Sequence, residues 1–409
     1  MERLLIKNIG TLATPEGKAA LKGKDQGRIR VSKNAWVLVC DGIIEDVGCG
    51  KAPVCAEVLD AEGALVTPGL TDAHTHLVFG GWRQNELALK LRGASYLDIL
   101  SAGGGILSTV RKTRAASEDG LYEKAKKDLD EMLSYGVTSA ELKSGYGLDY
   151  DTELKQLKIA RRLNETHPMD IRSTFLGAHA LPEEYNGRRE EYIRFLCEKM
   201  IPEVAKEKLA DYCDVFCEKG VFTADESKRI LEAGKRFGIM PKIHADEIEA
   251  IGGSELAGKI GAVSAEHLIV VRRSGIRSMA EGNVIACLLP ATSFYLNAEF
   301  APARAFIDEG VAVALGSDYN PGSCPSLNLQ FVMNLACLKY RLTPEEMLTA
   351  VTLNASAAIG LSGITGSVEK GKQADLVFWN AEDLDYLAYR MGSNLVRAVV
   401  KKGKVVYER

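Results

Sequence analysis

The chain has 409 residues, of which 46% are hydrophobic, and its formal net charge is −4. A chain of this length and composition can bury a large core, which excludes a disordered protein. The slight negative charge, with both signs interspersed, excludes the basic surface that nucleic acids and anionic lipids require. No apolar stretch is as long as a membrane span, and the N-terminus lacks the apolar segment of a signal peptide. We therefore expect a cytoplasmic protein whose partners are small molecules.

The nine cysteines are an odd number and lie scattered along the sequence. Some fall inside apolar runs, as Cys287 does within residues 284–288. Buried free thiols in a reducing compartment are therefore favoured over disulfides. Cys213 and Cys217 are four residues apart without a second such pair, which argues against a structural zinc cluster.

Both ends of the chain are rich in short predicted strands. Asp41-Gly42 between two apolar runs is a good hairpin signal. Because chain ends often lie close together, we expect residues 1–63 and 366–409 to form one small β domain, a β-sandwich assembled from both termini. Its predicted strands cover residues 35–40, 43–47, 374–379, 396–400 and 405–407.

The middle of the chain, residues 64–365, alternates short apolar runs with longer amphipathic ones. This alternation, over about 300 residues, is typical of a (β/α)8 TIM barrel. A doubly wound open sheet is the alternative, because alternation alone cannot show closure, although no Gly-x-Gly-x-x-Gly follows the first strand. The eight predicted strands cover residues 64–70, 137–142, 171–176, 212–216, 240–243, 262–265, 284–289 and 311–315. The predicted helices include residues 121–133, 154–163 and 188–207, one opened by a capping box at Thr223 and one starting at Thr343.

Histidines gather where predicted strands end. Side chains two residues apart on a strand share a face, so a His-x-His pair at a strand end points both imidazoles the same way. In a barrel the strand ends converge on one mouth, where active sites lie. The sixth histidine, His167, ends a helix, and we expect it to face solvent. The five histidines at strand ends are His74, His76, His179, His244 and His267.

A carboxylate reaches the same mouth, because the eighth strand ends in Gly-Ser-Asp at residues 316–318. Three imidazoles and one carboxylate suit Zn²⁺ or Fe²⁺, and the sequence does not distinguish the two ions. Taken singly, His244 could be a core histidine and Asp318 a turn cap. Because the four arrive from three separate strand ends, we interpret them as one divalent metal site. The predicted ligands are His74, His76, His244 and Asp318.

Several motifs resemble the amidohydrolase superfamily, and the resemblance covers essentially the whole chain. They are the Asp-Ala-His-Thr-His sequence at 72–76, the strand-end histidines, Gly-Ser-Asp at 316–318 and the tail at 366–377. Finer motifs resemble the branch of the superfamily that opens an imidazolone ring in histidine degradation. These lie at residues 79–83, 141–148, 177–180, 244–247 and 318–323.

The resemblance implies a reaction and an assembly. The reaction is hydrolysis of the cyclic amide of 4-imidazolone-5-propanoate to N-formimidoyl-L-glutamate, by a water molecule that a divalent metal activates. The assembly is a homodimer, for which no stripe in the sequence marks an interface. A small-molecule substrate and one Zn or Fe ion are therefore expected.

Three residues are expected to take part in the chemistry. Glu247 lies three residues beyond His244, where it could take the proton of the water and give one to the ring nitrogen, although it could also be an exposed loop acid. Asp318 could share this proton transfer. His267 is expected to orient the water or the oxyanion rather than to bind metal, because a fifth ligand would crowd the open position.

Other residues are expected to bind the substrate. The planar fork of Arg83 suits the propionate arm, with a surface ion pair as its alternative role. Tyr146 lies between glycines that permit a tight loop near the ligand. His179 is expected to hydrogen-bond to the imidazolone. Donors to the carboxylate that hydrolysis creates are expected at Asn320, Gly322 and Ser323.

Two other classes of enzyme and a non-catalytic protein are alternatives to this predicted function. A deaminase of a purine, pyrimidine or imidazole-like ring would use the same metal ligands. A binuclear cyclic amidase would need a bridging lysine on the fourth strand, which instead ends in Cys217 and Glu218, so we prefer one ion. A non-catalytic barrel scaffold would lack ligands that are present here. The run at 103–105, three glycines, could hinge a lid or form a plain turn.

Overall fold

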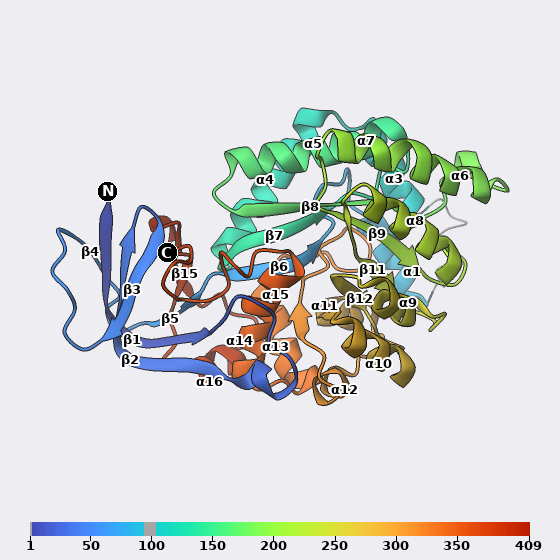
Figure 1. The fold of residues 1–409 in the computed structure, drawn as a ribbon. Helices are drawn as coiled ribbons and strands as arrows, with labels where there is room; N and C mark the ends of the chain where they lie inside the picture. The colour runs from blue at the N-terminus through green and yellow to red at the C-terminus, as the bar shows by residue number, and fades with distance from the viewer. Residues whose placement is uncertain (1, 94–103) are drawn as a thin grey trace.

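The computed structural model describes residues 2–93 and 104–409. Figure 1 shows a barrel of strands surrounded by helices, with a separate sheet at one side in which the two termini lie close together. The predicted (β/α)8 barrel with a small β domain from both chain ends is therefore confirmed. The predicted domain boundaries at 63/64 and 365/366 remain predictions, and the lid proposed at 103–105 begins outside the described residues.

Eight parallel strands follow one another around the barrel in chain order. The barrel closes beyond the last strand, where the Asp318 N–H donates to the His74 carbonyl and the His76 N–H donates to the Tyr319 carbonyl, both at 2.9 Å. This closure excludes the open doubly wound sheet. The strands are β6 (Leu70–Thr75), β7 (Val137–Lys143), β8 (Asp170–Ala178), β9 (Tyr212–Cys217), β11 (Ile243–Ala245), β12 (Ser264–His267), β13 (Ile285–Leu288) and β14 (Val313–Leu315), and the short β10 (Met240–Pro241) also pairs with β9.

Helices cover the outside of the barrel. The capping boxes predicted at Thr223 and Thr343 are both formed. The helix predicted over 188–207 contains a π-helical turn at Leu196–Met200, just before Pro202, which has no N–H for an α-helical bond. The helices are α1 (Leu87–Leu91), α3 (Ile106–Ala115), α4 (Glu118–Ser134), α5 (Tyr150–Thr166), α6 (Arg189–Phe195), α7 (Ile201–Lys206), α8 (Ala224–Arg236), α9 (Gly253–Ile260), α10 (Arg273–Gly282), α11 (Pro290–Leu296), α12 (Ala303–Asp308), α13 (Leu329–Tyr340), α14 (Pro344–Val351), α15 (Leu353–Ala358) and α16 (Leu384–Tyr389).

The terminal strands are joined in one hydrogen-bonded sheet with its own apolar core. The predicted hairpin turns at Asp41 and Gly42, both with positive φ. The strands of this terminal sheet, in spatial order, are β17 (Lys404–Glu408), β16 (Val396–Lys401), β15 (Leu376–Trp379), β5 (Leu65–Pro68), β1 (Arg3–Pro15), β2 (Ile29–Cys40) and β3 (Ile43–Cys49), with β4 (Glu57–Asp60) also paired to β1.

The single strand predicted over 64–70 is wrong, because the chain changes sheets within it. Residues 65–68 form β5 of the terminal sheet, and β6 of the barrel begins at Leu70. Pro68 has no N–H to continue a ladder, and the Gly69 N–H donates to the Asp375 carbonyl at 2.8 Å. A Cβ on Gly69 would lie 2.2 Å from Thr138 Oγ1, so only glycine fits this crossing.

His167 also differs from its prediction, because its side chain is buried rather than solvated. It caps the end of α5, and its Nε2 lies 3.2 Å from Asp130 Oδ1 on the neighbouring helix α4. Burial lowers its pKa despite this carboxylate. Helix packing, which the local sequence does not show, removes it from solvent.

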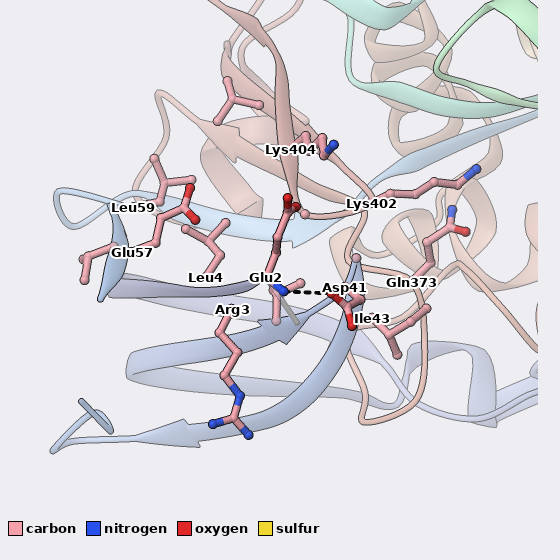
Figure 2. A pocket seen from close by; sticks show the side chains of 15 residues that line it. Glu2, Arg3, Leu4, Asp41, Ile43, Glu57, Leu59, Gln373, Lys402 and Lys404 are labelled. Atoms are coloured by element: carbon pink, nitrogen blue, oxygen red, sulfur yellow. Dashed lines mark hydrogen bonds between the residues drawn. The ribbon is translucent and has the colours of Figure 1, made fainter. Parts of the chain in front are cut away.

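The cysteines, the lengths of the helices and a groove on the terminal sheet are the remaining features of the fold. All nine cysteines are free thiols, as predicted. Among the described residues, no helix is long and apolar enough to cross a membrane. A groove on the terminal sheet contains the hydrogen bond from the Glu2 N–H to Asp41 Oδ1 (Figure 2), and no predicted site residue lines it.

Candidate metal centre and active site

The predicted site residues lie at the carboxyl ends of the barrel strands. His74 lies on β6 and His76 directly follows it, while His244 lies on β11 and His267 ends β12. The backbone turns sharply there, since Asp246, His267 and Asp318 have φ values of 52°, 68° and 54°. Such left-handed conformations cost non-glycine residues about 1–3 kcal/mol each and are typical of functional sites.

The four predicted metal ligands fall in two overlapping groups, His74 with His76 and Asp318, and His74 with His244 and His267. His74 Nε2 lies 3.2 Å from His76 Nε2, and Asp318 Oδ1 lies 3.5 Å and 3.4 Å from these two nitrogens. The His244 ring centroid is 4.7 Å from that of His74, and His244 Nε2 is buried without a hydrogen-bond partner. Two ligand atoms about 2.1 Å from one ion at a tetrahedral angle lie about 3.4 Å apart. The donor set therefore fits a divalent cation.

Carboxylates stand behind two of these histidines. Glu266 Oε2 lies 2.9 Å from His74 Nδ1, and Asp214 Oδ2 lies 3.0 Å from His244 Nδ1. A carboxylate on Nδ1 fixes the proton there and leaves Nε2 free as a metal ligand. Burial and Lys143 lower the pKa of His74, but bonds to Asp318 and Glu266 outweigh them and raise it to about 9. A proton and a cation thus compete for the same nitrogen.

Sequence reasoning missed a set of buried charges beneath the metal ligands. Lys143 Nζ lies 2.8 Å from Asp214 and 3.1 Å from Glu141, and Lys242 Nζ lies 2.8 Å from Glu141. Lys242 and Lys143 hold the pKa of Glu266 far below its usual range despite burial. The available signal was the presence of charged residues inside predicted barrel strands, where side chains from other strands must neutralise them.

His267 and Glu247 face each other beside the metal ligands. His267 Nε2 lies 3.7 Å from Glu247 Oε2, and its Nδ1 is buried without a partner. The nitrogens of His74, His244 and His267 all lie within 4.8 Å of one another, so His267 is close enough to touch a bound ion or its water. Burial lowers the pKa of His267 to about 3. Burial and the charge of Asp318 raise the pKa of Glu247 to about 8.

Arg83 lies at the rim, where a buried acid that sequence reasoning missed holds it. Its Nε and Nη2 donate to the two carboxylate oxygens of Glu86, at 3.0 and 2.9 Å. Glu86 also accepts from the Gly105 N–H at 2.8 Å. Gly322 of the loop after β14 lies against the remaining nitrogen, because a Cβ there would be 2.2 Å from Arg83 Nη1. The spacing of three residues between Arg83 and Glu86 was the only local hint.

Tyr146 and His179 line the same mouth. The His179 ring stacks on His76, with centroids 5.0 Å apart and 14° between the planes, and the Tyr146 ring lies 5.4 Å from His179. His179 Nδ1 lies 3.0 Å from the Gly145 carbonyl. This bond places the proton on Nδ1 and leaves Nε2 as an acceptor. Burial raises the pKa of Tyr146, which keeps its hydroxyl protonated.

Asn320 bonds within its own loop. Its Nδ2 donates to the Asp318 carbonyl at 2.7 Å and to Ser323 Oγ at 2.8 Å. Its Oδ1 accepts from the Gly322 and Ser323 N–H groups at 2.8 and 2.7 Å. The loop predicted to bind the product carboxylate is thus present at the rim, and Asn320 shapes it. Its role in binding remains a prediction.

Comparisons with known proteins agree with this geometry. The family model of the amidohydrolase family matches residues 65–406. The imidazolonepropionase of Alkaliphilus metalliredigens is 49% identical, covering 100% of this chain and 99% of that protein. The chain belongs to the imidazolonepropionase family of amidohydrolases. The imidazolonepropionase of Geobacillus thermodenitrificans is 50% identical over 99% of this chain and 98% of its own.

Solved structures show the same fold at much lower identity. Triazine hydrolase from Arthrobacter aurescens superposes with a TM-score of 0.77 at 18% identity, covering 100% of this chain and 95% of that one. An adenosine deaminase from Xanthomonas campestris with bound zinc gives a TM-score of 0.70 at 20% identity, over 98% and 92% of the two chains. These similarities extend across both the barrel and the terminal sheet.

Proposed function

We propose that this protein hydrolyses the ring amide of 4-imidazolone-5-propanoate to N-formimidoyl-L-glutamate in histidine degradation. The observation that carries the proposal is its 49% identity to an imidazolonepropionase over the whole chain. The mouth of the barrel supports it, because a metal-binding set lies beside a proton-transferring pair and a guanidinium at the rim. In the reaction the carbonyl carbon gains the water oxygen, its bond to the ring nitrogen breaks, and that nitrogen gains a proton.

His74, His76, His244 and Asp318 are proposed to hold one divalent ion. When bound, such an ion supplies two kinds of chemistry, lowering the pKa of a water ligand to about 7 and polarising a carbonyl. The buried Glu266 and Asp214 orient two of the imidazoles toward the site. The hydroxyl of Thr292 donates to Asp318 Oδ2 at 2.6 Å, which fixes the carboxylate plane.

Glu247 is proposed to move the proton. A pKa near 8 places this carboxyl close to working pH, so that it can accept a proton from water and return one to the ring nitrogen. Asp318 can share the transfer. His267, kept neutral by burial, is positioned to donate to the oxyanion that forms on the carbonyl.

The substrate is proposed to lie between the rim and the stacked rings. Arg83, aligned by Glu86, faces the propionate arm with Nη1, next to the loop that carries Gly322 and Ser323. Tyr146 offers a protonated hydroxyl to the ring. His179 Nε2 accepts a hydrogen bond from a ring N–H. Asn320 acts by holding its loop in place.

The test is to mix the protein with freshly made imidazolone propionate and follow the loss of its ultraviolet absorbance. Mass spectrometry should then detect N-formimidoyl-L-glutamate. A protein that keeps its metal but leaves the absorbance unchanged would contradict the proposal and favour the deaminase alternative. Less than about half an equivalent of tightly held metal would instead favour a non-catalytic scaffold.

Three finer properties belong to the same proposal. Zinc and iron both accept imidazole and carboxylate ligands, so elemental analysis of protein grown with each metal, followed by reconstitution, decides between them. A homodimer is inferred from the family, and its mass in solution is the measurement. A cytoplasmic location follows from a soluble metabolic role and is tested by cell fractionation.

A further inference from the structure

Helix α4 holds an ammonium group among aromatic rings behind the mouth of the barrel. Lys124 Nζ lies 3.1 Å from the centroid of the Phe79 ring. The rings of Tyr319 and Trp82 lie 5.0 and 5.4 Å from the same nitrogen. Phe79 and Trp82 belong to the loop after β6, whereas Tyr319 belongs to the loop after β14. One cation on a barrel helix therefore touches both loops.

Hydrogen bonds extend this connection on the same helix. Lys124 Nζ donates to the Leu77 carbonyl at 3.0 Å and pairs with Asp128 Oδ2 at 2.7 Å. The Tyr319 hydroxyl donates to the same Asp128 oxygen at 3.1 Å. Lys124 thus binds the loop after β6, and Asp128 binds the loop after β14. Because Lys124 and Asp128 are one helical turn apart on the same helix, the distance between them is fixed.

Burying this ion pair requires more desolvation free energy than an ordinary surface pair does. The side chains of Lys124 and Asp128 are 24% and 13% exposed, whereas the pair Lys126–Asp130 on the same helix is 41% and 52% exposed. Burial lowers the pKa of Lys124 to about 8 and raises that of Asp128. Apolar residues of similar volume would stabilise such a position equally well. Stability alone therefore does not account for the pair.

The loops after β6 and β14 also contact each other at the rim. Arg83 follows Trp82 directly, and Gly322 comes three residues after Tyr319. Arg83 Nη1 lies against Gly322, where a Cβ would be only 2.2 Å away. The rim contact, where the substrate carboxylate is proposed to bind, is therefore one of the places at which these loops join. Another is the group formed by Lys124, Asp128, Phe79, Trp82 and Tyr319, termed the α4 clamp.

We propose that Lys124 and Asp128 are positioning residues that set the distance between the two loops of the carboxylate-binding rim. This inference rests on the proposed function. The contacts of the Lys124 and Asp128 side chains include none of the proposed metal ligands, so these two residues should act on substrate affinity and not on the chemical step.

The test compares the variant Lys124→Met/Asp128→Asn with the matched variant Lys126→Met/Asp130→Asn, which removes the more exposed pair two residues further along the same helix. The clamp variant should raise KM for imidazolone propionate about tenfold or more, because small misplacements of binding groups are costly. Its kcat should stay within about threefold and its metal content should be unchanged. The matched variant should leave KM unchanged. Among variants of Lys124 alone, Lys124→Arg should raise KM less than Lys124→Met does.

Each other outcome decides against the inference. A folded clamp variant with unchanged KM overturns it, and so does a parallel loss of kcat and metal, which would indicate general damage to the barrel. If the double variant fails to fold, Tyr319→Phe removes only the hydroxyl that reaches Asp128 and should still raise KM about threefold; an unchanged KM there overturns the inference. An inactive wild-type protein would instead overturn the proposed function, and the inference with it.

Discussion

Burial moves the pKa values of Glu247 and His267 in opposite directions although the two side chains face each other. It raises the pKa of the carboxyl to about 8 and lowers that of the imidazole to about 3. At neutral pH the histidine is therefore a neutral donor or acceptor, while the carboxyl can hold or release a proton. Divergent environments for neighbouring titratable groups are typical of acid–base catalysis.

Replacing Glu247 with glutamine should separate proton transfer from metal binding. Glu247→Gln keeps the shape of the side chain but cannot accept a proton, so kcat should fall by about 10²–10⁴-fold. Metal content should not change, because the ligand atoms come from other residues. Glu249→Gln is the matched control, since Glu249 is exposed and pairs with the exposed Lys219. A Glu247 variant with turnover within tenfold of the wild type would assign the proton transfer to Asp318.

His267→Ala tests the count of metal ligands. Four donors from His74, His76, His244 and Asp318 already satisfy one ion, so the variant should keep its metal. Turnover should fall by about 10²–10³-fold if the imidazole donates to the oxyanion. Metal and activity are measured on the same preparation. Loss of metal would make His267 a ligand, which its distance from His74 and His244 permits.

At the scale of elements, the loops after β6 and β14 are proposed to bind the substrate. Gly322→Ala would place a methyl group where Arg83 Nη1 now lies, displacing the guanidinium from the rim. A charge-assisted hydrogen bond contributes about 1.5–3 kcal/mol, so KM should rise about ten- to a hundredfold. Gly363→Ala is the control, because a Cβ there meets no atom within 4 Å. An unchanged KM would place the propionate arm elsewhere.

Strand positions were predictable because apolar runs and strand ends are local patterns. Those patterns located His74, His244 and Asp318 and therefore the candidate metal site. Partners across the barrel were not predictable, because nothing in the local sequence shows that Glu266 meets His74. The passage from β5 to β6 was missed for a similar reason. An apolar run is compatible with either sheet. The position of the crossing depends on the close approach of Gly69 to Thr138, which the sequence does not show.

A buried polar cluster joins the terminal sheet to the barrel at the scale of the whole molecule. Asp170, at the start of β8, lies 2.6 Å from Lys401 and 2.9 Å from Lys402 of the terminal segment. Lys401 also lies 2.7 Å from Asp375, and Gln373 donates to Asp170 at 2.7 Å. The C-terminal segment therefore stabilises the bottom of the barrel, opposite the candidate metal site.

Lys401→Met should destabilise the whole protein. Lys401 is 1% exposed, so its loss leaves the buried Asp375 without the cation that it shares with the half-buried Asp170. Breaking a buried pair in this way costs about 3–5 kcal/mol. Chemical denaturation should show this decrease in the free energy of unfolding. Lys402→Met is the control, because Lys402 is 53% exposed and its pair with Asp170 should contribute less than about 1 kcal/mol.

The same cluster predicts how stability depends on pH. Lys401 and Lys402 outweigh burial and hold the pKa of Asp170 below its ordinary value of 3.8. A carboxyl with a lowered folded pKa stabilises the protein above its unfolded pKa, and this contribution is lost as the pH falls through 3.8 toward the folded value. The difference in unfolding free energy between wild type and Asp170→Asn should therefore be constant from pH 7 to pH 5. It should shrink below pH 4, measured by urea denaturation of metal-free protein so that loss of the ion does not contribute. A difference that stayed constant down to pH 3 would mean that Asp170 acts in this cluster as a hydrogen-bond acceptor, with no contribution from its charge.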